Sequence, residues 1–596
     1  MAGGTSGAAS DAGGCEFPVD PAGPVQLRLD LAVVTVTLEL TLNGRTMPDS
    51  PRLQSRGRFA FLKSDTAGHL VPVPAIGPAR VTTPLFAGTY DIAFIAFPDA
   101  VDLPKQGRVV LARGVTLTSN QTLTYDATTA LVAASLTLNG GAMAEATSPT
   151  RGRLTFRDLD GQWTASADLP ARGAATTSAL LFASRYQVVF ESSAGAVAMP
   201  SASRTVLDPN FVVTSARQMA WNLRTLTVRG AVTKNGSPLE EAPGTSGRAG
   251  VVFIEVDTNS SAFATLPATG PAAYQLQLFP GTYDVGVARG TVGLSTLPIG
   301  RKLVRRRLVI TSDLVLSLDV PVVSLTFTLT FNGGQLPDAA AGSGRASVQL
   351  FNADEFQGDF GLGSTGAGTS TGPLYTGAYT AKLSPDSRFT ELPAWAHVMG
   401  QLTINASGTQ TMNVEVGTVT GELTVNGSTM PDSPGLAGRG TLTLLDHTLG
   451  QTTGLLIPLG ARGPATFARK IYGGRYTGAF SPATDVSGMP GVGVARLGPD
   501  LVLAPGQTIR LDARWTTISG EVTFNGATPP PTSLGARGSI LFEPSWVRAP
   551  VLQFSSQTQV VSATGPLRFA QDVFAGDKQL LLLAEPGQAV LSRTCE

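Results

Sequence analysis

A few polar residues in this sequence have the type and spacing that ion binding would need. Asp158, Asp160 and Gly161 have the opening spacing of a calcium loop, which holds its ion with carboxylate oxygens. The third acidic residue and the distant bidentate glutamate of such a loop do not follow. A turn between two strands is therefore the favoured interpretation, and the sequence predicts no metal site.

A basic cluster stands at residues 301–307. It contains Arg301, Lys302, Arg305, Arg306 and Arg307. Such a cluster can bind an anionic polysaccharide or a lipid headgroup, because several cations act on one ligand. A solvated strand face is the alternative that we favour, since it needs no ligand. Polysaccharide is kept as a candidate partner.

Histidine and tryptophan do not recur at fixed places. His69, His397 and His447 fall at different positions of the repeat described below, so no shared site of histidine with carboxylate or serine can be assembled. Without a nucleophile motif or a metal set, we expect no enzymatic activity and no cofactor. The five tryptophans are also at non-equivalent positions, which favours local packing over a sugar-stacking platform: Trp163, Trp221, Trp395, Trp515 and Trp546.

An Asn-Gly pair is the feature that does recur. It first ends the alternating run 37–42, and successive pairs are 96, 96, 97, 94 and 99 residues apart: Asn43-Gly44, Asn139-Gly140, Asn235-Gly236, Asn332-Gly333, Asn426-Gly427 and Asn525-Gly526. Both residues tolerate the positive φ of a type I′ turn, so the pair after an alternating strand predicts a tight hairpin. The residues that follow, such as 430–434, are poor strand formers. A turn leading into a loop is therefore the alternative.

A tyrosine follows each of the first five pairs by 47 to 50 residues: Tyr90, Tyr186, Tyr283, Tyr379 and Tyr476. These tyrosines alternate with apolar neighbours. We expect them to be buried, with the phenol bonded to a loop backbone, rather than to be catalytic. An Arg/Gly pair also recurs and opens the second strand of each unit, at Arg56, Arg151, Arg248, Arg345, Arg439 and Arg537.

These anchors predict an all-β fold of six tandem seven-stranded Greek-key β-sandwiches. Each unit has a little under 100 residues, which is enough for a small core. The predicted division is a flexible tether at 1–24, a displaced strand at 25–32, and β-sandwiches at 33–129, 130–224, 225–320, 321–415, 416–514 and 515–596, the last without its final strand. We number these sandwiches as units one to six.

The pattern Val419-x-Gly421-x-Leu423, with Gly474-x-Tyr476 after it, resembles the carboxypeptidase-regulatory-like (transthyretin-like, prealbumin-like) β-sandwich family. Val228-x-Gly230-x-Val232 and Ile518-x-Gly520-x-Val522 repeat the motif, whereas Leu38, Ala134 and Phe327 replace its glycine and Gly576-Asp577-Lys578 replaces Gly-x-Tyr. The resemblance implies a non-catalytic module, common as an extracellular spacer, adhesive or surface-assembly unit. It supplies no active-site residues. A general immunoglobulin-like sandwich is the alternative.

Charge and hydropathy exclude two classes of partner. Lys+Arg and Asp+Glu are 43 each and only 14% of residues are charged, so the basic footprint of nucleic-acid binding is missing. No apolar run approaches the roughly 20 residues that span a bilayer. Residues 1–14 lack the basic and apolar regions of an intact signal peptide. A secreted protein or lipoprotein whose signal was removed, with Met1 added, has this pattern, so we expect the outer surface of a bacterium.

The two ends of the chain depart from the repeat. The sixth unit stops before its final strand, while a surplus strand, 25–31, precedes the first Asn-Gly. Asp30 lies 13 residues before Asn43, as Asp512 lies 13 before Asn525. Alternation places Val25, Leu27, Leu29 and Leu31 on one face.

We therefore expect residues 25–31 to complete the sixth sandwich, because uncovered sheet edges invite pairing. Within one chain this closes a ring, and between chains it makes a head-to-tail polymer by strand donation. An extra edge strand on the first sandwich is the alternative.

The two cysteines fall at nearly the same place on the repeat. Cys15 is 28 residues before Asn43, where Leu497 is 28 before Asn525, and Cys595 maps to Pro499. This predicts a Cys15–Cys595 disulfide, which suits an oxidising compartment. Free thiols at two frayed termini are the alternative.

The sequence thus favours an extracellular or cell-surface structural or assembly protein, lipid-anchored before processing, whose partners are itself or other surface proteins. The alternative is a multivalent carbohydrate- or surface-binding adhesin, in which repetition adds avidity to weak sites.

Overall fold

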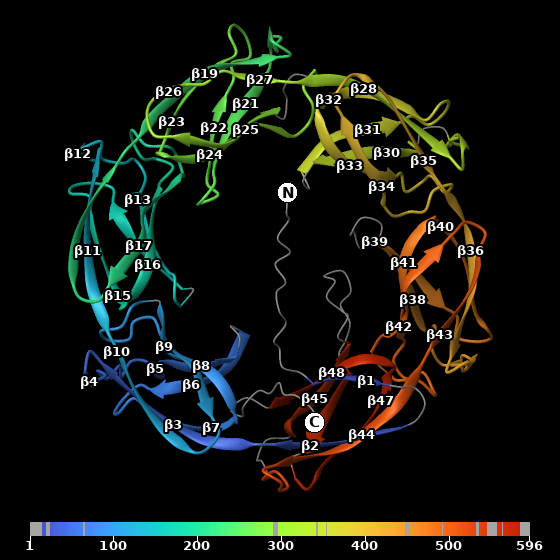
Figure 1. The fold of residues 1–596 in the computed structure, drawn as a ribbon, viewed down its shortest axis with the longest axis horizontal. Coiled ribbons are helices and arrows are strands. Elements are labelled where there is room, and N and C mark those ends of the chain that lie inside the picture. Colours follow the sequence, from blue (N-terminus) through green and yellow to red (C-terminus); the bar gives the residue numbers. More distant parts are fainter. Residues whose placement is uncertain are drawn as a thin grey trace.

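The computed structural model describes residues 15–19, 24–63, 66–105, 107–161, 163–289, 296–340, 344–352, 355–447, 453–491, 493–531, 536–544, 557–562 and 564–584. These residues form strands, turns and loops, with no helix among them (Figure 1). The all-β prediction is confirmed. Over these ranges no helix has the length and apolarity needed to cross a membrane.

The strands of units one to three follow the Asn-Gly repeat. Unit one contains β3 (Val33–Leu42), β4 (Arg45–Thr46), β5 (Ser55–Lys63), β6 (Thr66–Pro74), β7 (Arg80–Phe86), β8 (Gly88–Ala96), β9 (Gly107–Leu117) and β10 (Gln121–Ala127). Unit two contains β11 (Thr129–Leu138), β12 (Gly141–Ala142), β13 (Thr150–Asp158), β14 (Thr164–Pro170), β15 (Thr176–Phe182), β16 (Ser184–Ser192), β17 (Arg204–Val213) and β18 (Arg217–Leu223). Unit three contains β19 (Leu226–Lys234), β20 (Ser237–Pro238), β21 (Ala249–Glu255), β22 (Ser261–Thr265), β23 (Ala273–Leu278), β24 (Gly281–Arg289), β25 (Arg301–Ile310), β26 (Leu314–Val315) and β27 (Leu318–Val320).

The remaining strands continue the same order. Unit four contains β28 (Val322–Phe331), β29 (Gly334–Gln335), β30 (Ala346–Asn352), β31 (Glu355–Leu362), β32 (Thr369–Tyr375), β33 (Gly377–Pro385), β34 (His397–Ile404) and β35 (Gly408–Val414). Unit five contains β36 (Val416–Val425), β37 (Ser428–Thr429), β38 (Gly440–Asp446), β39 (Thr453–Leu459), β40 (Ala465–Tyr472), β41 (Gly474–Pro482), β42 (Ala495–Leu503) and β43 (Thr508–Ala513). Unit six contains β44 (Trp515–Phe524), β45 (Ala536–Pro544), β46 (Gln557–Ser562), β47 (Leu567–Phe574) and β48 (Gly576–Ala584), and two strands precede unit one, β1 (Cys15–Val19) and β2 (Val25–Leu31).

Each unit divides its strands between two sheets that enclose a core. In unit five, β43, β36 and β40 form one sheet with the short β37, and the other has the order β39-β38-β41-β42. The first and last strands, β36 and β43, run parallel, whereas their other neighbours are antiparallel. Leu423 of the first sheet and Leu444 of the second belong to one buried cluster. The predicted β-sandwich is confirmed.

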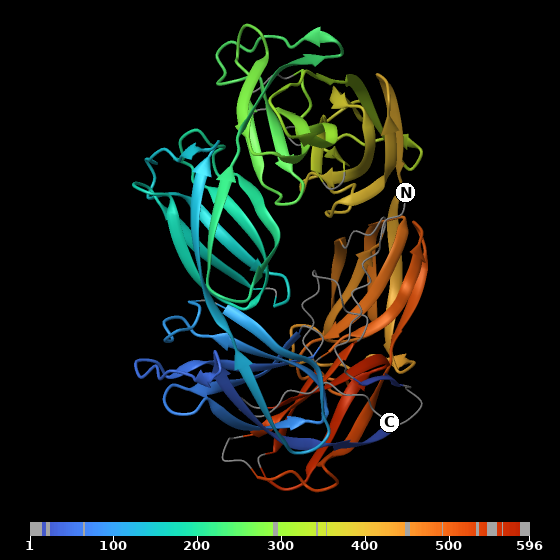
Figure 2. The ribbon, with the colours of Figure 1, turned by 60° about the vertical axis from the view of Figure 1, so that its left-hand side comes forward.

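The sandwiches follow one another around a closed ring (Figure 1). β3, β11, β28 and β36 lie on its outer side, and the second sheet of each unit lies on its inner side. The view turned by 60° shows the same closed path (Figure 2). The blue ribbons of β1 and β2 lie among the red strands of unit six in Figure 1, at the opposite end of the chain.

The Asn-Gly pairs are tight turns that lead into loops. Asn43 has φ +52° and Gly44 φ +71°, and the other five pairs have nearly the same values. Leu42 then pairs with Arg45 across a two-residue turn. In units one to five the returning strand has two residues, after which the chain leaves the sheet. The tight hairpin and the turn leading into a loop, which the sequence offered as alternatives, therefore both occur, one after the other.

Cross-strand packing explains the glycine of the Val-x-Gly-x-Leu motif. Gly421 is paired with Phe467 on β40, and a Cβ at position 421 would stand 2.4 Å from the Phe467 Cζ. Gly230 is paired with Tyr274 and Gly520 with Phe569, and at these two positions a Cβ would also meet a backbone carbonyl oxygen, that of Leu316 or Leu27. In unit four the large and the small residue change places: Phe327 stands at the position of the glycine, and its partner on β32 is Ser370. One large side chain thus fills this part of the core in each of these units, and the glycine follows the size of its partner.

Candidate functional site: the junctions between units

Each asparagine of an Asn-Gly turn bonds to the start of the next unit. The Asn43 Oδ1 accepts the Thr129 N–H at 2.8 Å, and the Asn43 Nδ2 donates to the Thr129 Oγ1 at 3.1 Å. Asn139 binds Thr225 in the same way. The next three asparagines each bind the N–H and C=O of one residue, namely Asn235 with Val322, Asn332 with Val416 and Asn426 with Trp515. The turn therefore ties each of the first five units to its successor.

A second polar side chain fixes the glycine of the same turn. The Asp126 Oδ1, on the last strand of unit one, accepts the Gly44 N–H at 2.8 Å and the Thr41 hydroxyl at 2.6 Å. The same acceptor recurs in the next four units as Asn222, Asp319, Asn413 and Asp512. It locks the last strand of each unit in register with the first.

An aromatic side chain from each later unit is inserted into the unit before it. Phe182 of unit two is 1% exposed and meets Phe94 of unit one edge-on, with ring centroids 6.3 Å apart. Phe279 packs on Phe190 and Phe574 on Phe480 in the same manner. Tyr375 joins the core of unit three and Tyr472 that of unit four. The core of one unit is thereby continuous with an aromatic residue of the next.

The repeated tyrosines hold these aromatic residues in place. Each phenol donates to the carbonyl four residues earlier, at 2.5–2.8 Å: Tyr90 to Phe86, Tyr186 to Phe182, Tyr283 to Phe279, Tyr379 to Tyr375 and Tyr476 to Tyr472. Burial raises the pKa of Tyr186, Tyr283, Tyr379 and Tyr476, so their hydroxyls stay protonated and keep donating. The arrangement gives these side chains a packing role.

Replacing Tyr476 with phenylalanine tests that role. The variant removes the hydroxyl bond to the Tyr472 carbonyl without changing the ring, and we expect unit five to lose about 1–2 kcal/mol of unfolding free energy. Hydrogen exchange of peptides from the unit that carries each substitution measures the loss. Tyr125→Phe is the control, because the Tyr125 hydroxyl has no hydrogen bond to any residue that the structure describes. Equal protection in both variants contradicts the positioning role.

In units one to five the arginine of the Arg/Gly pair is buried and bonded to loop carbonyls, whereas the side chain of Arg537 lies outside the described part. Arg439 is 0% exposed, and its guanidinium donates to the carbonyls of Met430, Pro431, Gly460 and Arg462. Arg56, Arg151, Arg248 and Arg345 do the same in their units. Burial lowers the pKa of Arg56 and Arg345. In each of these five units one cation thus joins the loop that follows the Asn-Gly turn to the turn near residues 74–77 in unit one and 460–462 in unit five.

β1 and β2, together called the N-terminal strap, lie in unit six. β1 pairs antiparallel with β48, and β2 pairs parallel with β44. In unit five these two positions are held by β42, beside β41, and by β43, beside β36. Unit six therefore contains two strands from the other end of the chain, where the sequence predicted one.

The apolar residues of β2 face the core of unit six. The register runs from Val25 opposite Ile518 to Leu31 opposite Phe524. Leu31 is 8% exposed, and Leu27 and Leu29 pack partly buried against the same cluster. The intervening residues of the strand are exposed. The side chain of Val25 lies outside the described part.

The junction of unit six with unit one repeats the contacts of the other five. The Asn525 Oδ1 accepts the Val33 N–H at 2.9 Å, and its Nδ2 donates to the Val33 carbonyl at 3.1 Å. The Asp30 Oδ1 accepts the Gly526 N–H at 2.7 Å and the Thr523 hydroxyl at 2.8 Å. These two bonds, the Gly526 bond first, hold the pKa of Asp30 below its ordinary value.

Apolar packing continues across the same junction. Phe86 of unit one meets Phe524 of unit six edge-on, with centroids 6.0 Å apart. One buried cluster includes Leu38 and Phe59 of unit one together with Ile518 and Val522 of unit six. The sixth junction is therefore equivalent in kind to the five within the continuous chain.

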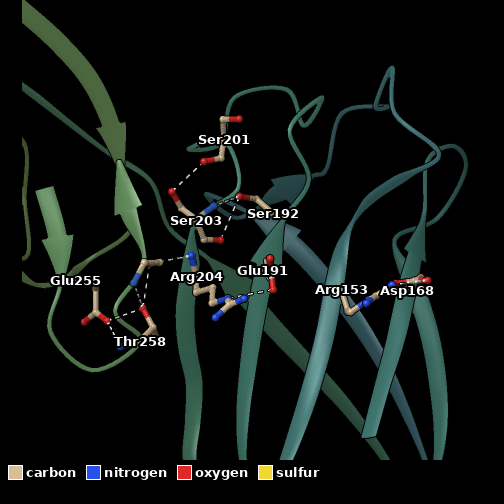
Figure 3. A network of polar contacts seen from close by, with 10 residues as sticks. Arg153, Asp168, Glu191, Ser192, Ser201, Ser203, Arg204, Glu255 and Thr258 are labelled. Carbon is tan, nitrogen blue, oxygen red and sulfur yellow. Dashed lines mark hydrogen bonds and ion pairs between the residues drawn. The ribbon is translucent and has the colours of Figure 1, made fainter. Parts of the chain in front are cut away.

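Polar contacts on the inner sheets differ from junction to junction. Between units two and three, the Ser260 Oγ accepts the Arg204 N–H at 3.2 Å, beside the Glu191–Arg204 ion pair and the hydrogen bonds of Glu255 with Thr258 (Figure 3). Between units four and five, His397 Nδ1 lies 3.0 Å from Asp446 Oδ2, and the imidazole stacks on Tyr472. These polar contacts supplement the asparagine bonds and the inserted aromatic residues that the junctions share, and they differ between the two junctions.

The other residues suggested by the sequence do not form a common site, although the Asp158 Oδ1 accepts the Asp160 N–H within one turn. The Asp158 Oδ1 accepts the Ser184 hydroxyl, and Asp160 forms an ion pair with Arg185. Within the ranges described, no group of three or more histidine, cysteine, aspartate or glutamate side chains could hold a metal ion. His69 bonds to Thr83 and His447 to Thr477.

The basic cluster lies on β25, an edge strand. Arg305, Arg306 and Arg307 are exposed, and no ion pair joins them to any described residue. Arg307 has φ +51°, and its N–H donates to the Asp284 Oδ1 at 2.7 Å. The Lys302 Nζ donates to the Thr376 carbonyl of unit four.

Several predicted residues lie outside the described part of the chain. Cys595, Trp546, 1–14 and 20–23 are among them, so the Cys15–Cys595 disulfide stays a prediction. Cys15 itself is in β1, opposite Leu580.

Sequence reasoning gave no structural role to three groups of residues, although each had a signal. The inserted aromatic residue stands four positions before each tyrosine, and in unit six Phe574 stands four before Lys578. The Asp or Asn acceptor lies 13 residues before the following Asn-Gly pair each time. The arginine was noticed only as a marker of a strand. Comparing the spacings of all six units, rather than the ends alone, identifies these positions.

Comparisons with known proteins give the following. No family model matches the chain, and no curated protein matches it. Among solved structures it is similar to the Bacillus anthracis TIE protein, at 14% identity over 62% of this chain and 67% of that one, with a TM-score of 0.14. It is also similar to the pilus adhesin SpaC from Lactobacillus rhamnosus GG in its open conformation, at 13% identity, 64% and 57% coverage and a TM-score of 0.16.

A third similar structure holds two B repeat units of the collagen binding protein of Staphylococcus aureus, at 11% identity, 65% and 99% coverage and a TM-score of 0.12. The resemblance to the carboxypeptidase-regulatory-like family is not confirmed by these comparisons. The β-sandwich architecture rests on the sheets themselves.

Proposed function

We propose that this protein is a non-catalytic structural component of the bacterial surface, in which the N-terminal strap closes the units into a ring within one chain. The observation that carries the proposal is the place of β1 and β2, which occupy in unit six the positions of β42 and β43 in unit five. The Asn525 and Asp30 contacts repeat those of the other junctions. Its partners are itself or other surface proteins.

Closure of the ring covers sheet edges that would otherwise be exposed in unit six. Without the strap, unit six lacks two strands and exposes the edges of β44 and β48. Such edges pair readily with other chains. Leu27, Leu29 and Leu31 also cover core that is otherwise open to water, and full burial of a leucine contributes about 1.5–3 kcal/mol. A closed ring thus protects a long row of small sandwiches that has no single large core.

The same contacts made between chains give a head-to-tail polymer. Closure within one chain is favoured, because the curved row of units holds the strap beside unit six, and a tethered partner whose span matches its site has a high effective concentration. Sedimentation over a wide concentration range, with reducing and non-reducing electrophoresis, tests the proposal. We expect one monomeric species. A ladder of sizes that grows with concentration supports the polymer instead.

The surface location rests on sequence features. Residues 1–14 are rich in Gly, Ala and Ser, and the two cysteines stand near the two ends. Both features suit an exported chain, anchored by lipid before processing, that meets oxidising conditions.

A second candidate function is binding of an anionic polysaccharide at β25. Exposed Arg305, Arg306 and Arg307 have no ion pair with described residues, which leaves three guanidinium groups for sulfate or carboxylate. Replacing all three with alanine should weaken binding of heparin at low salt about tenfold or more. Isothermal titration measures it, with Arg462→Ala and Arg469→Ala together as the control. Equal binding by both variants, or none by the unaltered protein, contradicts this function.

A further inference from the structure

Asn-Gly is the dipeptide at which asparagine most readily loses ammonia. The glycine nitrogen attacks the asparagine Cγ, a five-membered imide forms, and the side-chain nitrogen leaves as ammonia, taking up the proton of the glycine N–H. Water then opens the imide to aspartate or isoaspartate. The net reaction consumes one water and releases one ammonia, with no oxidant or reductant. Glycine favours it because no side chain hinders the approach.

We infer that Asn525 is a deamidation site that becomes reactive when the N-terminal strap leaves unit six, and that the product prevents the strap from returning. The inference rests on the proposed closure within one chain, because it requires a strap that can be released. It adds a covalent modification to that site.

In the closed ring both reacting groups are engaged in hydrogen bonds with other residues. The Gly526 N–H, which carries the attacking nitrogen, donates to the Asp30 Oδ1 at 2.7 Å. The Asn525 side-chain amide is bonded through both of its ends to the backbone of Val33. The turn is fixed at φ +50° for Asn525 and +74° for Gly526. The attack needs the amide to swing back over its own backbone, and these bonds prevent it.

The sixth pair differs from the other five in the origin of its protection. Asn43 and Gly44 are held by Asp126 and Thr129, which are part of unit one and the start of unit two. Asn525 and Gly526 are held by Asp30 and Val33, 492 to 496 residues away in the chain. Release of the strap therefore frees the Gly526 N–H from Asp30 and detaches the chain directly before Val33, the partner of the Asn525 amide. The other five asparagines keep their partners.

The product cannot remake the junction. A carboxylate at position 525 has no N–H to donate to the Val33 carbonyl, which the Nδ2 now contacts at 3.1 Å. It also adds a negative charge close to Asp30, which must bond to the neighbouring Gly526. Isoaspartate lengthens the backbone of a two-residue turn. Like charges and a lost donor both oppose rebinding.

Peptide mapping by mass spectrometry on the full chain tests the inference. Leu29→Asp places a charge against the core of unit six and releases the strap, whereas Gln26→Asp adds the same charge on the exposed side of β2. After incubation in mildly alkaline buffer, we expect Asn525 to deamidate about tenfold faster or more in Leu29→Asp than in Gln26→Asp or the unaltered chain. The other five asparagines of the same molecule are internal controls and keep their rates.

Hydrogen exchange of residues 24–31 separates the possible failures. If the strap is unprotected in the unaltered chain, the closure itself is wrong. If it is protected there and released in Leu29→Asp while Asn525 stays slow, the modification site is wrong. An equal rise at all six asparagines also overturns it, since that reports general unfolding. The second part of the inference is that the deamidated product keeps the strap from returning to unit six. The Asn525→Asp variant should therefore leave the strap exposed to hydrogen exchange, and full protection of the strap in that variant overturns this part.

Discussion

A chain that lacks residues 1–31 is expected to lose the ordered structure of unit six while units two to four keep theirs. The deletion removes β1 and β2, uncovers the edges of β44 and β48, and exposes the core beneath Leu27, Leu29 and Leu31. We expect the unfolding free energy of unit six to fall by roughly 4–8 kcal/mol, comparable to the whole stability of a small domain. Hydrogen exchange resolves the loss by peptide.

Adding the strap back supplies the control for this deletion. A synthetic peptide of residues 15–34 should restore protection to β44 and β48 at high peptide concentration, because the docking surface is unchanged. Small-angle scattering should show an increased radius of gyration for the truncated chain. Unaltered protection of unit six in that chain contradicts the role of the strap.

Replacing Arg439 with alanine is the second change with a large expected effect. The side chain is fully buried and donates to four loop carbonyls, so its removal leaves buried acceptors without donors and a cavity of guanidinium size. We expect unit five to lose about 3–5 kcal/mol of unfolding free energy. Lysine cannot replace the planar fork of donors, so Arg439→Lys should lose nearly as much.

Arg469→Ala is the matched control for Arg439, because Arg469 is exposed in the same unit. It should change the unfolding free energy by less than about 0.5 kcal/mol. Denaturant unfolding followed by the fluorescence of Trp395 and Trp515, which border the core of unit five, measures both variants. If Arg439→Ala and Arg469→Ala lower the unfolding free energy by the same amount, the buried bonds of Arg439 do not stabilise the loop.

The sequence predicted the repeat and the displaced strand because both rest on local chemistry. The tight turn at Asn-Gly needs positive φ, which few residue pairs allow. The spacing between successive pairs then gives the length of each unit. Asp30 then indicated that 25–31 belongs to a later unit. β1 was missed because five residues that include Pro18 carry no alternation. Only the unpaired edge of β48 gives that segment a partner.

The buried arginines and inserted aromatic residues were missed for a different reason. A charged residue is expected at the surface, and nothing local indicates that the carbonyls around Arg439 lack other donors. Phe182 looks like any core residue of its own unit, because sequence does not say which core an aromatic side chain enters. Contacts between units are a property of the folded chain, and so is the curvature that brings Asn525 to Val33.

Closure within a single chain is the central claim, and engineered cysteines test it most directly. Arg28 and Glu521 are opposite each other in the parallel register of β2 and β44. In a background with both native cysteines changed to serine, a chain carrying Arg28→Cys and Glu521→Cys should form an internal disulfide and remain monomeric. Chains carrying one cysteine each, refolded together, should give no cross-linked pair of an Arg28→Cys and a Glu521→Cys chain. Cross-linked pairs in the mixture, with multimers from the double variant, contradict the ring.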